Sequence, residues 1–372
     1  MKILVWQWGR RGAGPRFAVC LADALRGRAG IEVALSLCQD AEILAGPNPP
    51  SCEMAVRTYG GMAAFLLRLI TAPVALPFLL LRLRRIRPDL AICAMPGPLD
   101  PLMAVALWLS GTRLVVVVHD AVSHPGDGFP GQMVLQRMLC SAASGLAVMC
   151  EHVGARLRRQ SRTVIPFEHP PFGFDLPQTV RGDGPPRLLC FGRLLPYKGL
   201  DLLAAALATL DAEVEVRVVG SGPEAPALDA LRACRGVSVE NRWVPETEIG
   251  SLLAWSDALI LPYREASQSG VAATALAAGR PVIATSVGGL REQLADAPRA
   301  LLCEPEAGSL AQAIGLWLEA PFPLAPPMDA AAAWREAVTG LLATIGTALP
   351  PRRRPRRPFW APPLGGLRRP VS

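Results

Sequence analysis

The chain alternates short apolar, often β-branched runs with helical stretches almost from end to end. Strands that are separated by helices indicate parallel βαβ units with both faces of the sheet covered. The alternation therefore predicts an α/β fold. The expected strands of a first series are 2–6, 31–37, 89–93, 114–118 and 145–149, with a helix near 16–25.

A turn-rich stretch with six prolines, 166–186, ends this first series. The expected strands of a second series are 188–191, 213–219, 237–240, 258–261, 282–284 and 300–303, with helices that include 200–210 and 271–278. We therefore predict two Rossmann-like domains in tandem. The expected boundaries are 1–170 for the first domain, 171–186 for a linker, 187–327 for the second domain, 328–346 for a last helix and 347–372 for a disordered Pro/Arg tail.

The formal net charge of +7 is located in the tail. The last twenty-two residues hold seven Arg and no Asp or Glu, so residues 1–350 carry 31 cations and 31 anions. A neutral body argues against a nucleic-acid-binding domain, whose basic footprint lies on a folded face. We expect no nucleic-acid partner.

Lysine and cysteine usage adds two expectations. Only Lys2 and Lys198 are lysines among the 38 cations, so a lysine in a loop attracts attention. The nine cysteines include no CxxC pair, and several lie in apolar runs. Buried free thiols in a reducing compartment are therefore expected, and we predict a cytoplasmic protein.

One segment departs from a plain soluble pattern. Residues 62–81 are apolar except for Arg68 and Thr71, and a cluster of four Arg follows within 82–87. Three alternatives remain open: a transmembrane helix, a buried or partly exposed helix with a basic end, and a helix lying in a membrane interface. Arg68 and two prolines inside the run argue against spanning.

Ligands of open α/β sheets bind beyond the carboxyl ends of the strands, and a first candidate segment, 191–201, lies there. Gly192 permits an unusual backbone turn, while Arg193 and Lys198 place two cations at the mouth of the cleft. Two cations and a helix end suit a diphosphate whose charge grows as its bond to a sugar breaks. The alternative is a solvated surface loop.

A second candidate segment, 261–271, precedes the helix expected at 271–278. Ser269, Gly270 and Val271 open this helix, so their amides are expected to point at an anion or a sugar hydroxyl. The alternative is an ordinary helix cap by Ser269.

Five motifs then occur in order: Gly192-Arg193 with Lys198-Gly199, GSGP at 220–223, SQSGV at 267–271, AGRPV at 278–282 and VGGLRE at 287–292. Together they resemble the C-terminal half of the family 4, or group 1, glycosyltransferases over about 187–320. The resemblance implies the GT-B fold, in which two Rossmann-like domains face a central cleft and a C-terminal helix crosses back to the N-terminal domain. It implies retaining transfer from nucleotide-diphosphate sugars without a metal or cofactor.

By this resemblance, Arg193 and Lys198 hold the donor diphosphate and His119 contacts the transferred sugar, so these three are the predicted catalytic residues. Asp120 is the predicted acceptor contact. The predicted donor-binding residues are Gly12, Gly14, Gly192, Val244, Glu265, Ser269, Gly270 and Val271.

The sequence departs from the family at a pair of glutamates that are usually separated by seven residues. Ala266 and Thr274 stand there, and Glu265 lies one position early. This departure motivates an alternative, a non-catalytic nucleotide-sugar- or saccharide-binding protein. An NAD-dependent oxidoreductase is a weak third, because the loop at 9–14 is not GxGxxG. The four His, at 119, 124, 152 and 169, match no common metal spacing, so no metal is predicted.

We therefore expect a hexosyltransferase that acts on a lipid-linked saccharide acceptor in polysaccharide or glycolipid biosynthesis. The arginines of the tail and of the 82–87 cluster favour an anionic membrane surface. The expected location is peripheral, on the inner face of the plasma membrane.

Overall fold

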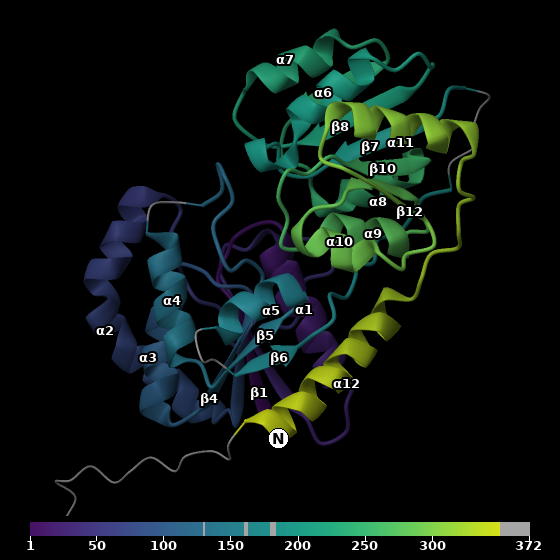
Figure 1. The fold of residues 1–372 in the computed structure, drawn as a ribbon. Coiled ribbons are helices and arrows are strands. Elements are labelled where there is room, and N and C mark those ends of the chain that lie inside the picture. Colours follow the sequence, from purple (N-terminus) through teal and green to yellow (C-terminus); the bar gives the residue numbers. More distant parts are fainter. Residues whose placement is uncertain (129–130, 160–162, 179–183, 350–372) are drawn as a thin grey trace, which may run out of the picture.

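The computed structural model describes residues 1–128, 131–159, 163–178 and 184–349. Two α/β domains face each other, with the chain passing between them twice (Figure 1). The Pro/Arg tail beyond residue 349 lies outside the described residues.

The N-terminal domain holds a six-stranded parallel sheet in the order β2-β1-β3-β4-β5-β6. Its strands are β1 (Lys2–Gln7), β2 (Glu32–Leu37), β3 (Leu90–Cys93), β4 (Arg113–Val118), β5 (Gly145–Val148) and β6 (Val164–Pro166). The connecting helices are α1 (Ala13–Arg26), α2 (Met62–Ile86), α3 (Asp100–Ser110), α4 (Gln132–Ala142) and α5 (Glu151–Arg158), with a 3-10 turn at Glu42–Leu44.

The C-terminal domain holds a second six-stranded parallel sheet in the order β12-β11-β10-β7-β8-β9. Its strands are β7 (Arg187–Phe191), β8 (Glu215–Gly220), β9 (Val237–Asn241), β10 (Ala258–Leu261), β11 (Val282–Thr285) and β12 (Ala300–Cys303). Its helices are α6 (Leu200–Ala208), α7 (Pro226–Ala233), α8 (Glu246–Trp255), α9 (Gly270–Ala277), α10 (Gly288–Leu294) and α11 (Ala307–Glu319), with a 3-10 turn at Pro196–Lys198.

The expected strands agree with the observed ones to within about two residues at each end, and the α/β prediction is confirmed. The sequence interpretation missed β6, which has three residues and ends on Pro166 at the sheet edge. Proline is tolerated there because an edge strand needs no further ladder donor.

Burial of the strands on both faces explains why they could be predicted from apolar runs in the sequence. In β4, Val115 and Val117 pack in a core beneath α1, while Val116 and Val118 pack in a second core with residues of α2 and α3. Successive side chains point to opposite faces, so a sheet covered on both sides needs apolar residues at every position. None of the nine cysteines, all of which lie in the described residues, forms a disulfide, and Cys38, Cys93 and Cys190 are buried as expected.

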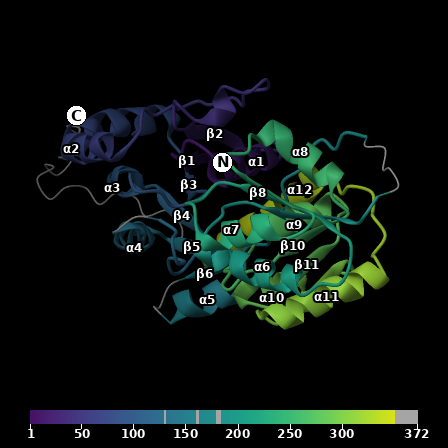
Figure 2. The same cartoon turned by 90° about the horizontal axis from the view of Figure 1, so that it is seen from above.

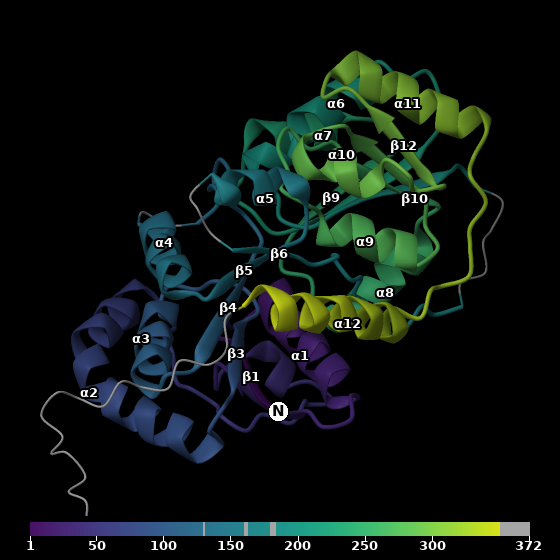
Figure 3. The ribbon, with the colours of Figure 1, turned by 60° about the horizontal axis from the view of Figure 1, so that its bottom comes forward.

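The last helix, α12 (Ala330–Ala348), crosses back from the C-terminal domain and lies along α1 (Figure 3). Trp334, Val338, Leu341 and Ile345 are buried in the N-terminal core at helical spacing. The Trp334 ring stands edge-on to Phe17 at 4.9 Å between ring centroids. The expected return of the C-terminal helix is confirmed.

The strand order positions the functional site. The order reverses between β1 and β3 in one sheet and between β7 and β10 in the other. Crevices at the carboxyl ends of strands beside such reversals are where ligands bind in open α/β sheets. The two crevices face each other across the domain interface.

Candidate active site

A cavity of about 540 Å³ lies between the domains, lined by the loops that follow strands of both sheets. The structure brings eleven of the twelve predicted site residues into its lining: Gly12, Gly14, His119, Asp120, Gly192, Arg193, Lys198, Val244, Ser269, Gly270 and Val271. The one exception is Glu265, which is exposed and lies outside the lining.

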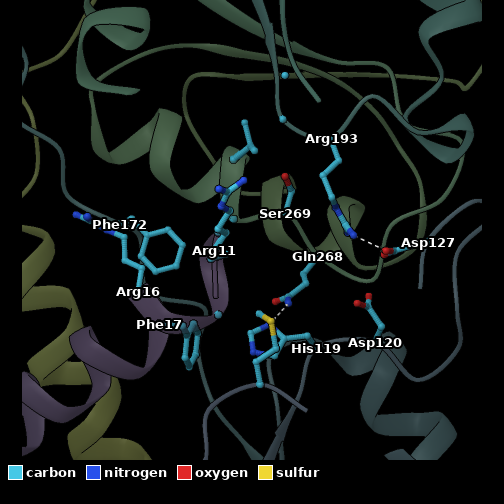
Figure 4. Close-up of a pocket in the computed structure, with 18 of the residues that line it drawn as sticks. Arg11, Arg16, Phe17, His119, Asp120, Asp127, Phe172, Arg193, Gln268 and Ser269 are labelled. Atoms are coloured by element: carbon cyan, nitrogen blue, oxygen red, sulfur yellow. Dashed lines mark hydrogen bonds and ion pairs between the residues drawn. The ribbon is translucent and has the colours of Figure 1, made fainter. Parts of the chain in front are cut away.

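Arg193 reaches across the cavity from the loop after β7. Its guanidinium is paired with Asp127, which follows β4 in the other domain (Figure 4). The same guanidinium donates to the Tyr197 hydroxyl at 2.8 Å. The cation predicted to hold a diphosphate is therefore paired with a carboxylate of the opposite domain in this arrangement.

Lys198 lies deeper in the same loop. Its Nζ is 3.6 Å from the centroid of the Tyr263 ring and 5.0 Å from that of Tyr197. Burial, reinforced by the nearby Arg193 guanidinium, lowers the pKa of Lys198 to about 7. The pKa of this amine therefore lies near neutral pH, and a bound anion would favour its charged form.

Two glycines of the expected motifs let neighbouring loops pass in contact. A Cβ at Gly220, at the end of β8, would lie 1.6 Å from the carbonyl oxygen of Gly192. A Cβ at Gly199, where φ is +66°, would lie 1.8 Å from the carbonyl oxygen of Pro262. Only glycine fits at these two contacts, which hold the loops after β7, β8 and β10 together.

The start of α9 combines both interpretations of Ser269. Its Oγ accepts a hydrogen bond from Ala272 N at 3.2 Å, so the side chain is a helix cap. Its own amide donates to Gln293 Oε1 at 2.9 Å. Gly270 and Val271 follow in the first helical turn, where amides lack intrahelical partners, and both line the cavity.

His119 is held by partners on both sides of its ring. Nε2 lies 2.9 Å from the carbonyl oxygen of Ala94, to which it donates, so Nδ1 accepts from the side-chain amide of Gln268 at 3.0 Å (Figure 4). Burial lowers the pKa of His119, which keeps the ring neutral. Contact between a ring nitrogen and a sugar would require Gln268 to move.

Gln268 was not among the residues predicted for the site. Its Oε1 is buried and has no hydrogen-bond partner among the described residues, and the residue lines the cavity. A buried acceptor without a donor is costly unless a ligand or water supplies one. Gln268 Oε1 is therefore a buried acceptor that this cavity offers to a ligand hydroxyl.

Asp120 and Glu265 both contact His124 instead of standing alone. His124 Nε2 lies 3.2 Å from Asp120 Oδ1, and His124 Nδ1 lies 3.3 Å from Glu265 Oε2. The His124 ring also stacks on the ring of Tyr197. The hydrogen bond to Asp120 raises the pKa of His124. Glu265 therefore joins the two domains through His124 and lies outside the cavity lining, in contrast to the other predicted donor-binding residues.

Arg16 and His169 also line the cavity, and the sequence interpretation did not place them there. Arg16, in the first turns of α1, pairs with Glu246 Oε2 at 2.6 Å and packs over Phe174. Burial and the neighbouring His119 lower the pKa of His169 to about 4, so its ring is neutral. The sequence could have indicated Arg16, because it lies four residues after Gly12, in the first turn of the helix that follows the glycine-rich loop.

Uncharged side chains stand at the two positions where glutamates were expected. Ala266 and Thr274 both line the cavity, at the positions where the family carries carboxylates. Within the described part of the chain, no three His, Cys, Asp or Glu side chains gather where they could hold a metal ion.

Comparison with known proteins supports the resemblance. Residues 185–320 match the family described as group 1 glycosyl transferases. Among curated relatives, a 2-deoxystreptamine glucosyltransferase of Streptomyces kanamyceticus is 31% identical over 183 residues, which are 47% of this chain and 46% of that protein. A GDP-mannose:glycolipid 4-beta-D-mannosyltransferase of Xanthomonas campestris pv. campestris is 32% identical over 192 residues, 49% of this chain and 53% of that protein. The chain thus spans about half the length of these relatives.

The fold extends over the whole molecule. The structure of Anabaena HepE in complex with UDP and glucose superposes with a TM-score of 0.64 at 18% identity, covering 94% of this chain and 95% of that one. At this identity the likeness shows the GT-B fold alone. The prediction of two Rossmann-like domains around a cleft is confirmed.

Proposed function

We propose that the chain, whose residues 185–320 match the group 1 glycosyl transferases, is a retaining glycosyltransferase that moves a hexose from a nucleotide-diphosphate sugar to a lipid-linked saccharide acceptor. The observation that carries the proposal is the convergence of Arg193, Lys198 and the start of α9 on one cavity. Cations and helix-start amides suit a diphosphate leaving group.

In the proposed reaction, Arg193 leaves Asp127 to bind the diphosphate, and Lys198 takes up a proton as the phosphate approaches. Both then stabilise the charge that develops as the sugar–phosphate bond breaks. Val244 lies beside the nucleotide base. Departure and attack on one face of the sugar retain its configuration, with the leaving phosphate accepting the acceptor's proton.

The proposed contact to the transferred hexose is Gln268. The positions equivalent to the family's carboxylates, Ala266 and Thr274, provide no charged acceptor, whereas Gln268 Oε1 is buried and unpaired among the described residues. An uncharged amide oxygen would therefore accept the hydrogen bond from the sugar hydroxyl in place of a carboxylate. We expect the protein to differ in its choice of donor sugar from relatives that carry the glutamate pair.

The test follows nucleoside-diphosphate release from a panel of nucleotide sugars, with and without saccharide acceptors. Replacing both Arg193 and Lys198 by alanine is expected to abolish release and donor binding. Arg264→Ala is the matched control, since Arg264 is an exposed arginine that pairs with Asp201 outside the cavity. Unchanged turnover in the double variant would overturn the proposal.

A second candidate is a non-catalytic sugar- or nucleotide-sugar-binding protein, favoured by the absence of both family carboxylates at Ala266 and Thr274. It predicts saturable binding of a nucleotide sugar without release of the nucleoside diphosphate under any acceptor condition. Transfer or donor hydrolysis by the purified chain would remove this candidate.

A further inference from the structure

Helix α2 exposes an apolar ridge. Met62, Leu66, Ile70, Val74 and Phe78 follow one another at every fourth position, and their exposed fractions run from 53% to 76%. Residues four apart form a continuous row on a helix surface. Only Phe65, Leu79 and Leu83 of this 25-residue helix are buried. A helix that is apolar all round is ordinarily enclosed by protein or lipid. The ridge of α2 is covered by no other part of the described chain.

The neighbouring helices extend the same surface. α2 packs on α3 and α3 on α4, and the three lie together at one side of the N-terminal domain, on the left in Figure 2. The exposed apolar side chains of α3 and α4 are Val105, Trp108, Leu109, Val134 and Met138. We call these residues, with the α2 ridge, the α2–α3–α4 face. Contiguous apolar surface of this kind marks a partner or a membrane.

The charges on these helices have one sign. Residues 54–88 contain six Arg and no Asp or Glu. α4 carries only Arg137, and the sole carboxylate of α3, Asp100, is fully buried. Arg82, Arg84 and Arg85 are exposed at the C-terminal end of α2, directly after the apolar ridge. Apolar side chains flanked by exposed arginines complement the acyl chains and anionic headgroups of a bilayer surface.

By length and composition alone, α2 is the one helix among the described residues that could cross a membrane. Its packing argues for lying flat instead. α2 runs along α3 and keeps Leu79 and Leu83 in the domain core. Pro73 and Pro77 lie within it, and each proline removes the donor that the carbonyl four residues earlier would use.

We propose that the α2–α3–α4 face docks on an anionic membrane leaflet, with α2 parallel to the bilayer and its apolar ridge among the acyl chains. α4 connects this surface to the cavity: Gln132, Met133 and Gln136 line the cavity, while Val134 and Met138 belong to the face. A lipid-linked acceptor held in the leaflet would reach the cleft along α4. That last link rests on the proposed function, whereas membrane docking does not.

The test is flotation of the full-length chain with vesicles of phosphatidylcholine and phosphatidylglycerol, compared with phosphatidylcholine alone. The triple variant Ile70→Ser, Val74→Ser, Phe78→Ser is expected to bind vesicles at least a hundredfold more weakly, because three large apolar side chains no longer enter the lipid. The variant Arg84→Gln, Arg85→Gln is expected to lose about thirtyfold on anionic vesicles only, at about a factor of five or six per cation.

Leu316→Ser with Met328→Ser is the matched control, since both side chains are exposed by more than half outside the face. Thermal melting and far-UV circular dichroism check that each variant is folded. A chain truncated after residue 349 separates the face from the Arg-rich tail and is expected to keep binding.

Three outcomes would overturn the docking proposal. One is vesicle binding that the triple variant retains in full. Another is binding that disappears on truncation alone. The last is a dimer, measured by light scattering, that the triple variant dissociates while no form of the chain binds vesicles. Because no donor or acceptor enters these assays, loss of docking and loss of transferase activity are distinguished.

Discussion

The pKa of Lys198 makes nucleotide binding depend on pH in a calculable way. Its pKa in the ligand-free protein is about 7, and only the protonated amine attracts a diphosphate. Between pH 7 and pH 9 the protonated fraction falls from about one half to about 1%, so binding of a nucleoside diphosphate is expected to weaken about 50-fold. Proton uptake on binding is expected to rise over that range from about half a proton at pH 7 to about one proton at pH 9.

Isothermal titration calorimetry in two buffers of different ionisation enthalpy measures both quantities. Lys198→Arg is expected to flatten the pH dependence, because a guanidinium stays charged throughout. Lys2→Arg is the matched control at the other lysine, which lies on β1 and pairs with Glu32, and it is expected to keep the slope. A dissociation constant that stays flat from pH 7 to pH 9 in the parent protein would refute the reasoning.

The same residue predicts a stability effect of opposite direction. The folded-state pKa of Lys198 lies below its unfolded value of about 10.4, so the unfolded chain binds more protons between these two values. The free energy of unfolding is therefore expected to rise with pH across this window. Urea denaturation at pH 7 and pH 9 measures the rise, which Lys198→Met is expected to reduce.

Three further predictions concern other parts of the structure. Gln268→Ala is expected to weaken binding of a nucleotide hexose about three- to tenfold, for one lost hydrogen bond, while leaving the free nucleoside diphosphate unaffected; equal weakening of both would refute its sugar contact. Gly220→Ala places a Cβ 1.6 Å from Gly192 O and is expected to destabilise the protein by roughly 1–3 kcal/mol in urea denaturation. Trp334→Ala is expected to cost about 3–5 kcal/mol by the same measurement, and a cost under about 1 kcal/mol would contradict the placement of α12 in the core.

The strands could be predicted because a doubly covered sheet leaves a continuous apolar run in the sequence, as in β4. The position of Arg193 and Lys198 at the cavity could be predicted because both lie in the segment between β7 and the helix that follows it. The side-chain contacts between the two domains could not be predicted, because no local sequence pattern indicates which distant residues meet. The contact of Gln268 with His119 joins residues 149 positions apart, and that of Glu265 with His124 joins residues 141 positions apart.

The solvent exposure of apolar helices could not be predicted from the sequence either. An apolar stretch such as 62–81 has the same composition whether protein or lipid covers it, so the sequence leaves three alternatives open for it. The lowered pKa of Lys198 is of the same kind, because it depends on burial beside Tyr263 and Arg193.

The return of α12 has a consequence for the order in which the protein is made. Residues 187–320 leave the ribosome before residue 330, so the C-terminal domain can fold while the N-terminal core still lacks Trp334, Val338, Leu341 and Ile345. Domains generally fold as units during synthesis, the N-terminal one first. Here we expect the reverse: the second domain to be finished first, and the first domain to be closed by the last helix to emerge.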